Sequence, residues 1–386
     1  MNIPFHKPIL PKNMKEIFPP SVESGWLTTG PQVEQFEKDL KQYLESENVV
    51  TVNSCTAALH LALAAKGFGA GDKFIVPTNT FVASVEVGEY LGMEPILIDS
   101  YIDDFNLDLN MVEYFLQKES NIKAIIPVHF AGKPVDMEMV SALADKFGIF
   151  VLEDAAHSLE AISNTGKVGN TYHASAFSFY ANKNITTCGE GGALSTNDKV
   201  LSDKIRKLSL HGISKDGWKR FKSHGKWRYD ISELGYKYNM NDVSASMGIW
   251  QLNNVEKWYK IRKNIVEKYN SGFKNIEGIT CPEIAKNVKE AFHLYIIKIN
   301  SDFWKLTRDE IIEEINKKGI GTSVHYIPVH MHSYYIRKYG YIPSDYPNAK
   351  RLSEKVISIP LYPALKTNHI NYIIDSIKEI WDNFKN

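Results

Sequence analysis

The chain has 386 residues, enough for one large domain and a smaller one, each with its own hydrophobic core. Its 45 basic and 45 acidic residues leave a formal net charge of zero, which argues against a nucleic-acid partner. The three cysteines, Cys55, Cys188 and Cys281, have the spacing of neither a disulfide framework nor a zinc site, so no metal site is predicted.

The N-terminal segment predicts a cytoplasmic protein. Residues 1–8 contain no apolar core of a signal peptide, and no run of about 18 apolar residues is present to cross a bilayer. We therefore expect a soluble protein without a membrane partner. Residues 1–30 are rich in proline and glycine and predict an irregular arm.

After this arm, short apolar strands alternate with helices. Helices are predicted at Val33–Leu44, Ala57–Lys66, Val82–Leu91, Met111–Lys118 and Met137–Phe147, and strands at Val49–Val52, Phe74–Val76, Pro95–Ile98, Ala124–Val128 and Ile149–Leu152. This alternation predicts an α/β fold, with a mostly parallel sheet between helices. No G-x-G-x-x-G opens a helix, so a dinucleotide-binding fold has no support.

The second half of the chain has a different pattern. The strand signal fades after Gly192, and residues 211–230 form a basic and aromatic insert. Helical spacing from Asp242 to Tyr269 predicts one long connecting helix. Beyond it, helices flank strands such as Leu294–Ile299, which predicts a second α/β unit. We place a large domain at 1–255, including the arm, and a small domain at 256–386.

One lysine follows a predicted strand at the point where polar residues and glycines begin. The aromatic-rich run from Ala174 predicts a buried strand, and Lys183 lies just past its end. Burial at such a strand end lowers the pKa of an amine while a loop keeps it open to a cleft. Ser178 can reach the same cleft. The alternative is a surface lysine after an edge strand.

The neighbours of this lysine match the needs of an aldehyde cofactor such as pyridoxal phosphate. That cofactor requires a lysine for its aldehyde and a carboxylate for its ring nitrogen. Glu153 and Asp154 follow the strand Ile149–Leu152. We choose Asp154, because alternation along a strand turns the two side chains to opposite sides. The alternative for Asp154 is a cap of the following helix.

The same cofactor needs a phosphate cup and a flat partner for its ring. The backbone amides of Cys55 and Thr56, with the Thr56 hydroxyl and Ser178, would form the cup at a helix N-terminus. An ordinary N-cap at Ser54 or Thr56 is the alternative. Phe81 would stack on the ring and His157 would lie beside the cofactor, and the alternative for both is core packing.

Several ordered motifs resemble those of the DegT/StrS family of nucleotide-sugar aminotransferases. They are Asn53-Ser-Cys-Thr-Ala-Ala-Leu59, Glu153-Asp-Ala-Ala-His157, Phe177-Ser-Phe-Tyr-Ala-Asn-Lys-Asn184, Glu190-Gly-Gly192, Gly25-Trp-Leu-Thr-Thr-Gly-Pro31, Gly235-Tyr-Lys-Tyr-Asn-Met240, His325-Tyr-Ile-Pro328 and Ser358-Ile-Pro-Leu-Tyr-Pro363. The resemblance implies a fold type I enzyme that uses pyridoxal phosphate (PLP, with its amine form PMP). It also implies a homodimer with each active site at the subunit interface.

By this resemblance each motif residue takes a role. Lys183 binds the cofactor aldehyde and moves the proton, and Asp154 pairs with the ring nitrogen. Thr56 and Ser178 hold the phosphate with Cys55, Phe81 stacks, and His157 stands where many relatives have Gln. Asn239 matches a residue that reaches the phosphate of the neighbouring subunit. Two departures concern the turns: Cys55 stands where Gly is common, and Thr186–Glu190 is one residue longer than the commonest spelling.

The substrate side follows partly from charge and partly from the resemblance. The basic cluster Lys215, Lys219, Arg220, Lys226 and Arg228 predicts a diphosphate site, with a solvated loop as the alternative. From this cluster Arg220 and Arg228 are predicted to bind substrate, and from the motifs so are Trp26, Thr28, His325 and Tyr326. His325, Tyr326 and His330 follow the strand-like Gly319–Val324 and are expected either to border the sugar or to hold the small domain in place.

The resulting hypothesis is a transaminase that uses glutamate as the amino donor. The acceptor would be a nucleotide-linked 4-keto-6-deoxy sugar aminated at C4, for lipopolysaccharide or other surface polysaccharide synthesis. Amination at C3, a small ketone as acceptor, and a catalytically silent regulatory homologue are the alternatives. The sequence does not distinguish C4 from C3 and does not identify the base of the nucleotide.

Overall fold

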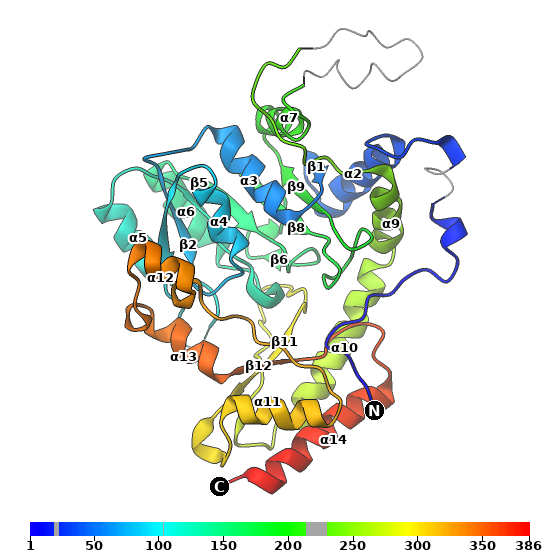
Figure 1. Cartoon of the computed structure of the whole chain (residues 1–386), viewed down its shortest axis with the longest axis vertical. Helices are drawn as coiled ribbons and strands as arrows, with labels where there is room; N and C mark the ends of the chain where they lie inside the picture. Colours follow the sequence, from blue (N-terminus) through cyan, green and yellow to red (C-terminus); the bar gives the residue numbers. More distant parts are fainter. Residues whose placement is uncertain (19–22, 103, 214–229) are drawn as a thin grey trace.

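The computed structural model describes residues 1–18, 23–102, 104–213 and 230–386. A seven-stranded sheet forms the centre of the larger of its two α/β parts (Figure 1). The strands, in spatial order, are β1 (Asn48–Val52), β9 (Gly192–Thr196), β8 (Ala174–Ser178), β5 (Phe150–Asp154), β4 (Ile122–Ile125), β2 (Lys73–Pro77) and β3 (Glu94–Ile98). Only β9 runs against the others. The predicted α/β fold with a mostly parallel sheet is therefore confirmed.

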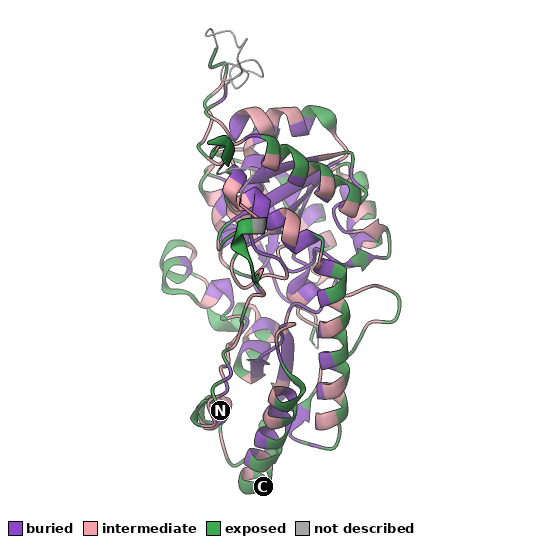
Figure 2. Cartoon of the chain, turned by 90° about the vertical axis from the view of Figure 1, so that its right-hand side faces the viewer, coloured by how far each residue is buried: buried purple, intermediate pink, exposed green. Residues whose placement is uncertain are grey.

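Helices cover both faces of this sheet. One face packs against α3 (Cys55–Lys66), α4 (Ala83–Glu89) and α7 (Lys199–Leu208). The other face packs against α2 (Pro31–Leu44), α5 (Leu109–Lys118), α6 (Met137–Phe147) and α9 (Asp242–Leu252). Because both faces are covered, the strands are apolar at successive positions rather than at alternate ones. Figure 2 shows the resulting buried interior beneath partly exposed helices.

A second, three-stranded sheet lies in the C-terminal half, at the bottom of Figure 1. It contains β10 (Ile279–Thr280), β11 (Tyr295–Ile299) and β12 (Val356–Ile359), and it packs against α10 (Val255–Phe273), α11 (Arg308–Lys317) and α14 (Thr367–Phe384). Helices α12 (Ser333–Tyr339) and α13 (Pro347–Lys355) and the short strands β6 (Ile162–Ser163) and β7 (Gly166–Lys167) complete the main elements of the described chain. No helix in the described ranges is both long and apolar enough to cross a membrane.

Two segments connect the two sheets. Ile3 of the N-terminal arm packs in the core of the small sheet and pairs in parallel with Ile320. In the opposite direction, Val329 and Tyr335 pack in the core of the large sheet. The division into domains 1–255 and 256–386 remains a prediction, and these segments cross it.

Two predictions from the second half are wrong. The strand signal was expected to end at Gly192, but residues 192–196 form β9, between β1 and β8. The single helix predicted over Asp242–Tyr269 is two helices, since α9 ends at Leu252 and α10 begins at Val255. The Asn253-Asn254 pair separates them, and asparagine competes with helical hydrogen bonding through its side chain. Most of the basic insert, residues 214–229, lies outside the described residues.

Candidate active site

One cavity of about 520 Å³ collects most of the predicted site residues. Its walls include Cys55, Thr56, Phe81, Asp154, His157, Ser178, Lys183, His325 and Tyr326. The first seven come from the ends of β1, β2, β5 and β8 and the segments that follow them. The carboxyl ends of parallel strands share one edge of a sheet, so segments far apart in sequence meet there.

Lys183 lies in the hairpin that joins β8 to β9. Two backbone hydrogen bonds close this hairpin, from the Phe179 amide to the Gly191 carbonyl and from the Ala181 amide to the Gly189 carbonyl, each 2.9 Å. Burial lowers the pKa of Lys183 to about 8, although nearby Asp154 favours the charged amine. Since β8 lies inside the sheet, the alternative of a surface lysine after an edge strand is wrong.

Asp154 ends β5 with its carboxylate held by two donors. The Ser84 hydroxyl donates to Oδ2 at 2.6 Å, and the Ala156 amide donates to Oδ1 at 3.1 Å. The Ser84 hydroxyl also lies 2.9 Å from the Thr80 hydroxyl, and all three side chains are buried. Each carboxylate oxygen keeps a further lone pair for a group in the cavity.

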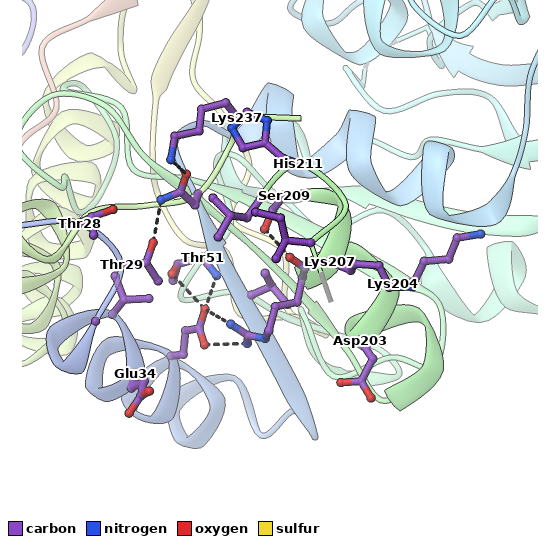
Figure 3. A pocket seen from close by; sticks show the side chains of 18 of the residues that line it. Thr28, Thr29, Glu34, Thr51, Asp203, Lys204, Lys207, Ser209, His211 and Lys237 are labelled. Atoms are coloured by element: carbon purple, nitrogen blue, oxygen red, sulfur yellow. Dashed lines mark hydrogen bonds and ion pairs between the residues drawn. The ribbon is translucent and has the colours of Figure 1, made fainter. Parts of the chain in front are cut away.

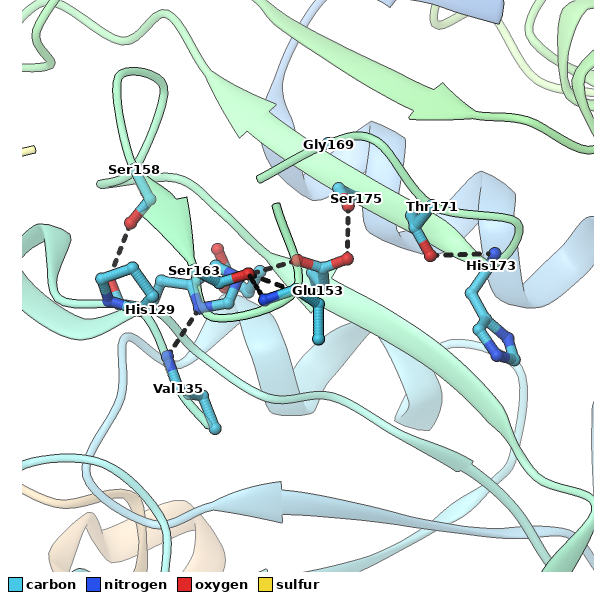
Figure 4. Close-up of polar contacts among 12 residues, drawn as sticks. His129, Val135, Glu153, Ser158, Ser163, Gly169, Thr171, His173 and Ser175 are labelled. Carbon is cyan, nitrogen blue, oxygen red and sulfur yellow. Dashed lines mark hydrogen bonds and ion pairs between the residues drawn. The ribbon is translucent and has the colours of Figure 1, made fainter. Parts of the chain in front are cut away.

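Glu153, the neighbouring carboxylate, points to the other side of β5, because side chains alternate along a strand. There it is buried and forms hydrogen bonds within the interior (Figure 4). His129 Nε2 lies 2.9 Å from Glu153 Oε2, and the Ser175 hydroxyl donates to Oε1 at 2.9 Å. The Val135 amide donates to His129 Nδ1, which leaves the proton on Nε2 to face the glutamate. Glu153 is not among the cavity residues, so the choice of Asp154 over Glu153 agrees with the geometry.

The N-terminus of α3 forms one wall of the cavity. Ser54 is its N-cap, accepting a 3.1 Å hydrogen bond from the Ala57 amide, which identifies Ser54 rather than Thr56 as the cap. The first amides of a helix have no partner inside it and attract anions. A Cβ at Gly192 would lie 2.5 Å from the Cys55 nitrogen, so only glycine lets β9 approach this closely. Burial raises the pKa of the Cys55 thiol, which keeps it neutral.

Two rings face the cavity with different surroundings. Phe81 is 58% exposed, which contradicts the alternative of core packing. His157 is buried, and its Nδ1 accepts a 3.2 Å hydrogen bond from the Ala131 amide. The proton therefore lies on Nε2, which is 3.3 Å from the Tyr326 hydroxyl. Burial and the charge of Lys183 lower the pKa of His157 well below its ordinary value, so the ring is neutral.

Three predicted residues lie elsewhere, in a separate pocket of about 900 Å³ between α2 and α7 (Figure 3). Trp26, Thr28 and Asn239 line it. The Asn239 amide donates to the Thr29 hydroxyl at 2.7 Å and accepts from Lys237 at 2.6 Å. Within one chain the structure therefore does not bring these residues to Lys183. Arg220 and Arg228 lie outside the described residues.

Of the two predicted histidines in the C-terminal half, one lines the cavity and the other does not. His325 lines the cavity, and its Nδ1 is 2.8 Å from the Ser358 hydroxyl. His330 is fully buried against the Thr78 hydroxyl at 2.7 Å and is not among the cavity residues. His330 thus attaches its segment to the end of β2, in line with the alternative of a holding role.

Sequence analysis missed Ser84, which supports Asp154, and Tyr180, which lines the cavity. A serine in the first turn of a helix carries no distinguishing signal by itself. Ser84 becomes recognisable only because the start of α4 lies beside the end of β5.

The cavity fits a phosphate-bearing aldehyde cofactor. It offers an amine of lowered pKa, a fixed carboxylate, a helix N-terminus and an exposed ring. Across the residues that the structure describes, no group of three or more His, Cys, Asp or Glu side chains could hold a metal ion. Fold and site together are those expected of the class of α/β enzymes that hold pyridoxal phosphate through a lysine.

Comparison with known proteins identifies the family. Residues 10–378 match the DegT/DnrJ/EryC1/StrS aminotransferase family, and the chain belongs to it. The spore coat polysaccharide biosynthesis protein SpsC of Bacillus subtilis is 40% identical over 379 residues, which cover 98% of this chain and 97% of SpsC.

Solved structures agree in fold over the whole chain. The PMP-form of Spr1654 from Streptococcus pneumoniae has a TM-score of 0.90 and 32% identity, covering 99% of this chain and 98% of that one. Helicobacter pylori PseC, an aminotransferase involved in the biosynthesis of pseudoaminic acid, has a TM-score of 0.89 and 28% identity, with 100% of both chains covered. The fold type I prediction and the family resemblance are therefore confirmed.

Proposed function

We propose that this protein is a PLP-dependent aminotransferase that moves an amino group from glutamate to a nucleotide-linked keto sugar. The single observation that carries the proposal is the meeting of Lys183, Asp154 and the N-terminus of α3 around one cavity. The family and the PLP-form and PMP-form of Spr1654 support the cofactor. SpsC and PseC, named for polysaccharide and sugar-acid biosynthesis, support a sugar acceptor and a role in surface polysaccharide synthesis.

When bound, PLP supplies an aldehyde that takes up the amino nitrogen and a ring that withdraws electrons from the reacting carbon. Lys183 would hold the cofactor through its aldehyde, and its Nζ, when free, would move the proton at the donor carbon. A pKa near 8 suits this task, because the amine can both accept and return a proton near neutral pH. Asp154 would pair with the ring nitrogen and keep it protonated.

The other residues of the cavity would bind and orient the cofactor and the substrates. The Cys55 and Thr56 amides, with the Thr56 and Ser178 hydroxyls, would hold the phosphate at the start of α3. Phe81 would cover one side of the ring, and neutral His157 would lie beside the cofactor with its Nε2 proton directed at the Tyr326 hydroxyl. His325 and Tyr326 border the space left for donor and acceptor.

We also propose a homodimer with shared active sites. Trp26, Thr28 and Asn239 would serve the cavity of the partner subunit, because in one chain they line a different pocket. Large apolar side chains are exposed at the mouth of the Lys183 cavity, with Phe81 at 58% and Tyr180 at 48%, and a partner would cover them. Arg220 and Arg228 remain predicted ligands of the acceptor diphosphate.

For the acceptor we propose amination at C4 of a 4-keto-6-deoxy sugar. The test is incubation with glutamate and a panel of nucleotide sugars carrying ketones at C4 or C3, with small ketones as controls. Mass spectrometry and NMR of the product then report the position of the new amine. C3 amination or reaction with small ketones alone would overturn the acceptor, and no product together with no coloured cofactor would favour a silent homologue. A cytoplasmic location remains a prediction.

A further inference from the structure

The residue directly after the cofactor-binding lysine has its side chain in the interior. The Asn184 amide nitrogen donates to Glu160 Oε2 at 2.7 Å and to the Ala291 carbonyl at 3.3 Å. The other oxygen of Glu160 pairs with the Arg262 guanidinium, and both charged side chains are almost completely buried. Because its NH₂ group faces a carboxylate, the orientation of the Asn184 amide is fixed, with Oδ1 on the opposite side.

Asn184 Oδ1 faces a second buried histidine. It lies 3.0 Å from His293 Nδ1, and an amide oxygen only accepts, so His293 carries its proton on Nδ1. Burial lowers the pKa of His293 well below its ordinary value, which keeps the ring neutral. The His293 ring packs against the His157 ring, with the two centroids 4.3 Å apart.

The two histidines are also tied to one turn of the backbone. The Ala131 amide donates to His157 Nδ1, and the Ala131 carbonyl accepts from the His293 amide at 3.0 Å. A continuous path therefore runs from Lys183 along the backbone to Asn184, and from its side chain through His293 to His157. Two groups on the cavity wall, an amine and an imidazole, are held relative to each other through a partner behind that wall.

We propose that Asn184 is a positioning residue that couples Lys183 to His157. The buried Glu160–Arg262 pair fixes the Asn184 amide, and the amide oxygen in turn holds His293 in one tautomer. The proposal rests on the proposed function, since it assigns Lys183 and His157 to the cofactor. Asn184 itself lies behind the cavity wall and is not among the cavity residues. Its effect on the reaction is therefore exerted through the position of the other two.

The first experiment compares wild type with Asn184→Ala in the half-reaction with glutamate, which needs no sugar. The single-turnover rate constant per bound cofactor should fall about tenfold, the equivalent of one buried hydrogen bond, while the Kd for glutamate stays within about twofold. Asn270→Ala is the matched control. The Asn270 side chain also bridges two partners, the Tyr295 hydroxyl and the Pro282 carbonyl, but lies in the C-terminal core. It should lower Tm and leave the rate constant unchanged.

The second experiment reverses the polarity of the central contact. Asn184→Asp places two carboxylates against each other and should slow the half-reaction at least as much as Asn184→Ala. Adding Glu160→Gln restores a donor, since the new amide can bond the new carboxylate while its oxygen still faces Arg262. The double variant keeps the net charge of the cluster and should return to within about threefold of wild type. Failure of the double variant to regain the rate would contradict the proposal.

The third measurement needs no cofactor and therefore separates this proposal from the proposed function. Nitrogen NMR of imidazole-labelled apoprotein should show His157 protonated on Nε2 and His293 on Nδ1. Asn184→Ala should remove the single tautomer of His293. The proposal would be contradicted by an unchanged His293 signal, or by an Asn184→Ala variant that has a lower Tm but reacts at the wild-type rate. Either result would leave Asn184 with a structural role alone. If wild type itself does not react with glutamate, the proposed function fails while the NMR result still tests the network.

Discussion

The cavity around Lys183 and the pocket around Asn239 differ in how completely one chain builds them. The first contains an amine, a carboxylate, a helix N-terminus and an exposed ring, all from segments that meet at one edge of the sheet. The second contains Trp26, Thr28 and Asn239, and the side chains of Trp26 and Asn239 both donate hydrogen bonds to Thr29. The first brings the groups of the proposed reaction together within a single subunit, and the second holds residues that we propose to act on a partner subunit.

If the proposed dimer is correct, the reaction and the contact between subunits are specified by different parts of the chain. Reacting groups must hold fixed distances, and strand ends in one sheet provide that rigidity. Residues that only bind a phosphate or the distant part of a substrate can come from a second subunit, because they do not take part in the bond changes. We therefore expect substitutions in the cavity to act on the chemical step and substitutions in the pocket to act across the dimer.

The largest effect is expected at Asp154. Asp154→Asn keeps the shape but cannot hold a proton on the ring nitrogen, so single-turnover rates with glutamate should fall by roughly 10²–10³-fold. Its matched control is Glu153→Gln on the same strand, which disturbs the buried contacts with His129 and Ser175. That variant should lower Tm while rates per bound cofactor stay near wild type. Near-normal turnover in Asp154→Asn would show that the wrong carboxylate was chosen.

A smaller effect tests the proposed sharing of sites. Asn239→Ala should weaken cofactor retention about tenfold through the loss of a phosphate contact. Dimers mixed from Lys183→Ala and Asn239→Ala subunits then contain one fully intact site, provided that Asn239 acts on the partner. About half the wild-type activity per mixed dimer is expected, measured after tandem-tag purification. Mixed dimers no more active than Asn239→Ala alone would place Asn239 at its own subunit's cavity and contradict the sharing.

A third test removes the support behind the carboxylate. Ser84→Ala deletes the 2.6 Å hydrogen bond to Asp154 Oδ2 but leaves the charge in place. The half-reaction rate should fall by roughly threefold to tenfold, the value of one hydrogen bond to a charged group partly replaced by water. Ser84→Thr should recover most of the rate, because it restores a hydroxyl. A rate unaffected by Ser84→Ala would show that the Ala156 amide alone fixes the carboxylate.

The smallest effect concerns stability and pH in the apoprotein. The pKa of Lys183 is lowered by burial from 10.5 to about 8, so the unfolded chain binds more protons than the folded one between these values. This group therefore costs stability at neutral pH, and the cost disappears as pH rises from 8 to 10.5. Lys183→Met should raise Tm by roughly 2–4 °C at pH 7 and by less at pH 10. A gain independent of pH would indicate better packing instead.

The cavity was largely predictable from sequence because its residues follow strands, and strand ends of a parallel sheet converge. The positions of Asp154 and Lys183 could each be predicted from the strand that precedes the residue in the sequence. β9 was missed because Gly192, Ala193 and Ser195 are small and Thr196 is the only β-branched residue in it, which is a weak strand signal. That glycine is required by the approach of β9 to the start of α3, a contact between segments far apart in sequence. Ser84 and Asn184 were missed for the same reason, since their partners lie on other elements.

The most direct test of the central claim is reduction of the PLP-loaded protein with borohydride, followed by peptide mapping. The account predicts a phosphopyridoxyl group on the peptide that contains Lys183, and loss of both this adduct and the coloured band in Lys183→Ala. An adduct on another lysine, or a coloured band that survives in Lys183→Ala, would contradict it.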